Sequence, residues 1–290
     1  MMPPGRIRRF GALALLVVTA GCAAGATHTA RVAACSPARG DTSVGDALLH
    51  VPRKARAPLP LVVAFHGAGG SGAGFADESG LSRSADRHGF AVLYPQAGSS
   101  RRFWSLNRAA RPDDVQRLRA VLPEATRRAC ADPRRLYATG VSNGGGFAAR
   151  VACEMSGSFA AVAPVAGGYS SLDRCPRAAR ASVLEIHGSA DQVVPYNGRG
   201  ADRAGDVRAY VAAWARRDGC DARPRTTHPA RYVTRVAYSH CPRGAAIEHV
   251  RLEGTDHGWP GAAPPWPRHH PAGVLAQEMV WRFFQDHRLR

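Results

Sequence analysis

The chain has 290 residues, 45% of them hydrophobic, which is enough for one large domain with a full core. Its formal net charge is +17, and arginine carries almost all of it, with Lys54 as the single lysine. The arginines are scattered between hydrophobic segments, which argues against the basic stripe of a nucleic-acid-binding protein. The excess of arginine is explained by a coding bias toward arginine. The alternative explanation is that it attracts the protein to acidic wall polymers or to anionic lipid.

Residues 1–26 have the pattern of a targeting segment, because arginines are followed by an apolar run that is too short to cross a bilayer. Residues 19–22 (Thr-Ala-Gly-Cys) resemble a bacterial lipobox, in which Cys22 becomes the lipid-bearing first residue. Cleavage by signal peptidase after Ala24 or Ala26 is the alternative. We therefore expect an exported protein, extracellular or at the cell surface, and attached to the membrane if Cys22 is lipidated.

Strand-like and helix-like segments alternate along most of the chain, after a linker and edge strand in residues 27–60. Strands are predicted at 47–51, 61–65, 90–94, 135–139, 159–165, 182–186 and 247–252, and helices at 78–88, 113–130, 147–153, 207–217 and 274–286. This alternation requires parallel strands with helical crossovers. It predicts an α/β domain over residues 61–290 with an open, mostly parallel sheet, helices on both faces, an insertion at 222–244 and no large cap domain.

Residues 140–144, Gly-Val-Ser-Asn-Gly, place Ser142 between two glycines, after a predicted strand and before a predicted helix. This is the pattern of a nucleophile elbow. A serine hydroxyl is a poor nucleophile unless a base takes its proton, so it must stand clear of the backbone at a turn that only small neighbours permit. The alternative is a glycine-rich turn with an incidental serine.

Asp191 and His257 each follow a predicted strand, so they should reach the same sheet edge as Ser142. The order serine, acid, histidine is that of the α/β-hydrolases. We expect His257 to take the proton of Ser142 while Asp191 holds the imidazole in position. Asp256 is a poor alternative to Asp191, since it is adjacent to His257 in the chain.

A glycine-rich loop at residues 66–72 follows another buried strand. Such a loop brings backbone N–H groups against a ligand, so the amides of Ala68 and Asn143 are predicted to form the oxyanion hole. Trp104 and Trp259 are candidate substrate-binding residues. For Trp104, packing beneath the loop of residues 95–111 is the alternative.

Four motifs occur together in order: His-Gly at 66–67, Gly-Val-Ser-Asn-Gly-Gly at 140–145, Asp-Gln-Val-Val-Pro-Tyr at 191–196, and His-Gly-Trp-Pro-Gly at 257–261. In these motifs the chain resembles the exported esterases grouped with polyhydroxybutyrate depolymerases and feruloyl esterases. The resemblance implies a triad enzyme that cleaves hydroxyacid polyesters, which are polymeric substrates, or feruloyl or acetyl esters of carbohydrates.

The mechanism that this resemblance implies needs no metal or organic cofactor. The twelve histidines also lack the H-E-x-x-H spacing of a zinc site. Two other functional classes stay open: an α/β-hydrolase of another kind, such as a serine peptidase, and a non-catalytic surface-binding protein.

Six cysteines other than Cys22 indicate three disulfides in an exported protein. In the α/β-hydrolase arrangement the helices ending near Cys130 and Cys153 are neighbours, and both cysteines are expected at the edge opposite Ser142. This geometry predicts the bond Cys130–Cys153. Cys220 and Cys241 bracket the insertion, which predicts Cys220–Cys241 and, by elimination, Cys35–Cys175.

Overall fold

The computed structural model describes residues 1, 35–106, 113–169, 175–176, 178–198, 205–262, 269–271 and 273–290. The chain forms two units, Met1–Ala34 and Cys35–Arg290, and the elements described below belong to the second. The expected targeting segment, with Cys22, lies outside the described residues apart from Met1. Among the helices that the structure describes, none is long and apolar enough to cross a membrane.

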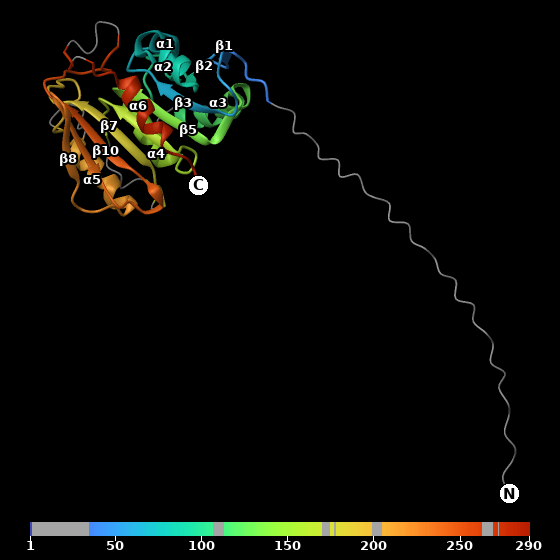
Figure 1. Ribbon diagram of the computed structural model, residues 1–290. Helices are drawn as coiled ribbons and strands as arrows, with labels where there is room; N and C mark the ends of the chain where they lie inside the picture. Colours follow the sequence, from blue (N-terminus) through green and yellow to red (C-terminus); the bar gives the residue numbers. More distant parts are fainter. Residues whose placement is uncertain are drawn as a thin grey trace. The chain divides into compact units, whose positions relative to one another are not determined.

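A ten-stranded sheet runs through the second unit (Figure 1). Its six central strands are parallel and lie in the order β4, β3, β5, β6, β7, β10. Their bounds are Ala91–Tyr94, Leu59–Phe65, Ala131–Val141, Ala161–Val165, Ser182–Gly188 and Ile247–Leu252. Parallel pairing brings all six carboxyl ends to one edge, where open α/β sheets bind their ligands. No large cap domain covers that edge in the part of the chain that the structure describes.

Antiparallel strands complete the sheet on both sides. At one side β1 (Gly40–Val44) pairs with β2 (Ala47–Val51), which pairs with β4. At the other, β9 (Val233–Tyr238) pairs with β10, and β8 (Arg225–Ala230) forms the edge. The β8–β9 hairpin occupies the predicted insertion. Strand β2 has the bounds predicted for it, whereas β1 lies in the segment that was predicted to be a linker.

Helices cover both faces of the sheet, as predicted. The core on one face includes residues of α3 (Asp114–Ala129), α4 (Asn143–Glu154) and α5 (Val207–Asp218). The core on the other face includes residues of α1 (Gly72–Ser79), α2 (Leu81–His88) and α6 (Ala276–Gln285). Strand β3 has no exposed side, because alternate residues enter the two cores; this explains its continuous apolar sequence.

The single helix predicted at residues 78–88 is instead two helices that meet at Gly80. Gly80 has φ of +70°, a left-handed conformation that ends α1 and precedes the first residue of α2. Ser71 caps the start of α1 by accepting a 3.0 Å hydrogen bond from the Gly74 amide. Gly80 was therefore the signal in the sequence for a break between two helices, although it had been predicted to lie inside one helix.

Three disulfides are present, and two of the three predicted pairings are wrong. The bonds are Cys35–Cys130, Cys153–Cys175 and Cys220–Cys241, so Cys130–Cys153 and Cys35–Cys175 do not form. The prediction assumed that the ends of α3 and α4 meet. Instead, the N-terminal segment lies along the end of α3, where the Ala38 amide donates to the Arg128 carbonyl oxygen, and it reaches Cys130.

Cys153, near the end of α4, is bonded to the connection between β6 and β7, which carries Cys175. Each of these two bonds therefore joins a helix end to a nearby loop or terminal segment, and neither joins two helices. The expected bond Cys220–Cys241 is present and closes the base of the β8–β9 hairpin.

Candidate active site

Ser142 lies at the sharp turn between β5 and α4. Its backbone has φ of +58° and ψ of −122°, a conformation that L residues rarely adopt and that typically costs about 1–3 kcal/mol. The turn is possible because Gly140 and Gly144 flank it: a methyl group at Gly144 would overlap the carbonyl oxygens of Phe65 and His66. The turn thus has the backbone geometry that the glycine pattern predicted.

The structure brings Ser142, His257 and Asp191 into one hydrogen-bonded row. His257 Nε2 lies 2.9 Å from Ser142 Oγ, and His257 Nδ1 lies 2.7 Å from Asp191 Oδ2. A carboxylate can only accept, so Nδ1 carries the proton and Nε2 is left to accept from the serine hydroxyl. Asp256, the rejected alternative, instead accepts from the amide of His269.

Asp191 is buried and firmly held. Its Oδ1 accepts hydrogen bonds of 2.9 Å and 2.8 Å from the amides of Val193 and Val194. Burial opposes its charge, but hydrogen bonds from His187 and His257 outweigh burial and hold the pKa of Asp191 well below its usual range. The carboxylate therefore stays ionised beside His257 at neutral pH.

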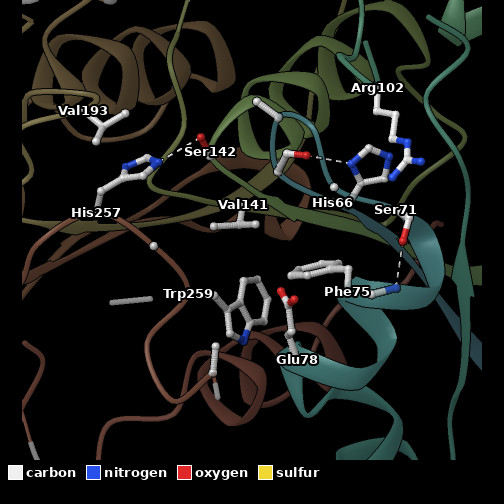
Figure 2. A pocket seen from close by; sticks show the side chains of 16 residues that line it. His66, Ser71, Phe75, Glu78, Arg102, Val141, Ser142, Val193, His257 and Trp259 are labelled. Atoms are coloured by element: carbon white, nitrogen blue, oxygen red, sulfur yellow. Dashed lines mark hydrogen bonds between the residues drawn. The ribbon is translucent and has the colours of Figure 1, made fainter. Parts of the chain in front are cut away.

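A pocket of about 620 Å³ opens beside Ser142 and His257 (Figure 2). In this view Ser142 and His257 lie on one side of Val141, and Phe75, Trp259 and Glu78 lie on the other. The rings of Phe75 and Trp259 meet edge to face, with centroids 5.3 Å apart. Val193, Ala262, Glu78 and Arg102 also line the pocket, so its walls combine aromatic, aliphatic and charged groups. Trp259 is part of the pocket lining, and a role in substrate binding remains a prediction.

Ala68 and Asn143, whose amides were expected to form an oxyanion hole, lie near Ser142 on two elements. Ala68 lines the pocket from the exposed glycine loop after β3. Asn143 is the first residue of α4, and the first amides of a helix have no acceptor within the helix. Both amides therefore come from segments whose backbone adjoins Ser142.

Trp104 was expected to line the substrate cleft, and this is wrong. Only 4% of its surface is exposed, and its ring stacks on Phe147 with centroids 4.8 Å apart. Its amide donates to Asn143 Oδ1, and its indole nitrogen donates to the His66 carbonyl oxygen. The apolar surface of Phe147 thus holds Trp104 beneath the loop, so the packing alternative is the correct one.

The loop that carries Trp104 is held by Asp114. Asp114 accepts hydrogen bonds of 2.8 Å from the amides of Gly98 and Ser105. The neighbouring Asp113 does cap α3, by accepting from the Val115 amide. Of the two adjacent acids, Asp113 caps the start of the helix and Asp114 holds the loop.

His66 has a structural role in the glycine loop. Its Nδ1 donates a 2.7 Å hydrogen bond to the Gly67 carbonyl oxygen, and its Nε2 accepts from the Ala97 amide. Burial, assisted by the charge of Arg102, lowers the pKa of His66. The neutral ring therefore ties the glycine loop to the segment after β4.

Behind Asp191 lies a polar cluster that the sequence analysis missed. Glu185 and His187 are buried on one side of β7, and His249 is buried on the neighbouring β10. Glu185 Oε1 lies 2.9 Å from His187 Nδ1, and Oε2 lies 2.6 Å from His249 Nδ1. The available signal was two ionisable residues at i and i+2 in an otherwise apolar strand.

The fold and the site together define an α/β-hydrolase. More particularly, the chain belongs to the family described as Esterase PHB depolymerase, whose model matches residues 44–216. It is therefore a carboxylic ester hydrolase by family.

Individual relatives agree with this assignment. NocK of Nocardia uniformis subsp. tsuyamanensis, a protein named as an esterase, is 32% identical over 76% of this chain and 70% of its own length. Feruloyl esterase B of Piromyces equi is 29% identical over 68% of this chain, which spans only 39% of that longer protein. An acetyl xylan esterase from Aspergillus awamori shares the fold, with a TM-score of 0.63 at 17% identity over 84% of this chain and 98% of that one.

Proposed function

We propose that the chain hydrolyses esters through an acyl-enzyme formed on Ser142, and the row of hydrogen bonds from Ser142 through His257 to Asp191 carries this proposal. His257 Nε2 takes the hydroxyl proton as Ser142 Oγ attacks the ester carbonyl carbon. Asp191 holds the ring in the required tautomer and stabilises the imidazolium that forms. The imidazolium then protonates the departing alcohol, and water releases the acid in a second, equivalent step.

The oxyanion of the tetrahedral intermediate would be held by the backbone amides of Ala68 and Asn143. The glycine loop and the start of α4 adjoin Ser142, and the positive end of the α4 dipole favours negative charge there. Both donors belong to the backbone and are fixed before the substrate arrives. They would therefore stabilise the charge without reorganising.

The proposed substrates are esters of carbohydrates with feruloyl or acetyl groups, or hydroxyacid polyesters. Among these, the rings of Phe75 and Trp259 in the pocket lining favour an aromatic acid, because an aromatic ring packs well against other aromatic rings. The names of the feruloyl esterase relative and of the matching family agree with these classes. The pocket lies at an edge that no large cap covers among the described residues, so it would also admit part of a polymer.

The experiment compares four substrates: methyl ferulate, p-nitrophenyl acetate, a polyhydroxybutyrate film and a chromogenic peptide. We expect turnover of one or more esters, with methyl ferulate having the highest kcat/KM, and no cleavage of the peptide. Ser142→Ala should lose several orders of magnitude in kcat on every ester, since the three residues act as a unit. Retained activity in Ser142→Ala, or phosphonate labelling of another serine, would reject the assignment.

Export is also part of the proposal, with the chain either lipid-anchored at Cys22 or released after cleavage. The basic and apolar segments at the N-terminus support it. The three disulfides fit an oxidising compartment outside the cytoplasm.

A further inference from the structure

Asp191 stands between two imidazoles, and both approach the same carboxylate oxygen. His257 Nδ1 lies 2.7 Å from Asp191 Oδ2, and His187 Nε2 lies 3.3 Å from the same oxygen. The proposed mechanism uses only the first of these contacts. His187 is fully buried and does not line the pocket, so it cannot act on the substrate directly.

The surroundings of His187 require a proton on each ring nitrogen. Nδ1 faces Glu185 Oε1 at 2.9 Å, and Nε2 faces the Val194 carbonyl oxygen at 2.8 Å in addition to Asp191. Carbonyl and carboxylate oxygens can only accept, so both nitrogens must donate and the ring is an imidazolium. Burial opposes this charge, but Glu185 and the hydrogen bonds to Asp191 and Val194 outweigh burial and raise the pKa of His187 to about 10.

Glu185 is the counter-charge that makes a buried imidazolium tolerable. Its carboxylate accepts from Tyr169 Oη at 2.7 Å and from His187 Nδ1 on one oxygen, and from His249 Nδ1 on the other. Burial opposes its ionisation, but the charge of His187 and hydrogen bonds from both histidines lower the pKa of Glu185 to about 2. Because three donors stabilise its negative charge, the Glu185 carboxylate is ionised.

Tyr196 connects this cluster to further charged groups. Tyr196 Oη lies 2.8 Å from His249 Nε2, and the Tyr196 ring meets the His187 ring edge to face. The guanidinium groups of Arg208 of α5 and Arg251 of β10 lie over the Tyr196 ring, 5.7 Å and 5.2 Å from its centre. The titratable and charged groups around His187 are therefore Glu185, Asp191, Tyr169, Tyr196, His249, His257, Arg208 and Arg251.

We propose that His187, held as an imidazolium by Glu185, is a positioning residue that orients Asp191 and limits how strongly Asp191 draws a proton onto His257. The inference rests on the proposed function. A positive charge on His187, close to the shared oxygen, disfavours a second positive charge on His257. The charge on His187 therefore offsets part of the attraction that Asp191 exerts on a proton, which leaves His257 Nε2 free to accept the serine proton.

The test is the pH dependence of kcat/KM for the wild type and His187→Gln. Glutamine keeps an amide donor for Val194 but carries no charge. We expect the acid limb of the profile to move to higher pH by about one unit. We expect kcat to fall while KM changes less than threefold, because His187 is absent from the pocket lining. An acid limb that stays in place would overturn the proposal.

Two further variants separate charge from packing. Glu185→Gln removes the counter-charge that keeps the buried His187 protonated, so the acid limb should move in the same direction. Tyr169→Phe removes another hydrogen bond to Glu185 while leaving both charges in place. It should lower the melting temperature without moving the acid limb. Equal shifts in all three variants would show a general packing defect and overturn the proposal.

A direct measurement needs no variant and no activity. The ¹⁵N signals of His187 should show both ring nitrogens protonated at pH 8. A neutral His187 at that pH would overturn this inference even if Ser142 proves to be the nucleophile. Conversely, an inactive wild type with a protonated His187 would reject the proposed function alone.

Discussion

The indole Nε1 of Trp104 donates a 2.8 Å hydrogen bond to the carbonyl oxygen of His66. This carbonyl lies where β3 ends and the glycine loop begins, so the contact connects the loop of Trp104 to the segment proposed to hold the oxyanion. The same indole stacks on Phe147 and meets Phe65 edge to face. Trp104 is thus a support for the site rather than part of its surface.

We therefore expect Trp104→Phe to retain the stacking but to lose the hydrogen bond, leaving a buried carbonyl oxygen without this donor. The free energy of unfolding should fall by about 1–2 kcal/mol. Because the glycine loop would be less well held, kcat should fall more than KM rises. Urea unfolding and ester kinetics on one preparation check both effects, and unchanged kcat would contradict the supporting role.

Gly144 is predicted to accept no side chain. In Gly144→Ala the new methyl group would overlap the carbonyl oxygens of Phe65 and His66, so the turn at Ser142 must shift. We expect a stability loss of about 2–3 kcal/mol together with loss of ester turnover.

Gly67→Ala is the matched control for that stability measurement. Its methyl group would lie 3.6 Å from Val141 Cγ1, an ordinary contact distance. It should cost under about 1 kcal/mol. Similar stability losses in the two variants would show that the space around Gly144 is not the deciding factor.

Asp218 should make stability fall as the pH rises. It is buried at the end of α5, and burial raises its pKa from 3.8 to about 6 despite Arg180 Nε at 3.6 Å. Asp218 is protonated more readily in the folded than in the unfolded protein. Its contribution to the free energy of unfolding is therefore complete below pH 3.8 and is lost as the pH rises through 6.

Asp218→Asn cannot ionise, so its stability relative to the wild type should rise between pH 4 and pH 6 and then stay constant. The pKa difference corresponds to about 3 kcal/mol at most. Urea unfolding of both proteins between pH 4 and pH 8 measures the change. A difference independent of pH would contradict this role of Asp218.

Cys22 decides between the two modes of export. If it is lipidated, the protein should sediment with the membranes of its host, and Cys22→Ser should be released from them. Fractionation and N-terminal sequencing are the measurements. Wild-type protein free in the medium, beginning at Gly25 or Thr27, would instead indicate cleavage by signal peptidase.

Local sequence signals determined most of the fold and the residues brought together at the site. The buried strand β3 is a continuous apolar run, and the turn at Ser142 is specified by glycines within a few residues of it. The succession of strands and helices then fixes the sheet edge at which Asp191 and His257 emerge. These features depend on neighbours in sequence or on general rules of chain connection.

The features that were missed depend on which segments meet in space. The partner of Cys130 is set by the path of the N-terminal segment along α3, and no spacing in the sequence records that path. The burial of Trp104 likewise depends on Phe147, more than 40 residues away. The cluster around Glu185 needs β7 and β10 to be neighbours before its charges can be paired.

The outer strands have a consequence for handling the protein at high concentration. An exposed edge strand can recruit a strand from another molecule and so seed β-aggregates. Strand β8 has mostly exposed side chains and a break in its pairing with β9, and Pro229 offers no N–H for a new partner. At the opposite edge β1 is only five residues long. We expect these features to suppress edge-to-edge growth when the protein is concentrated.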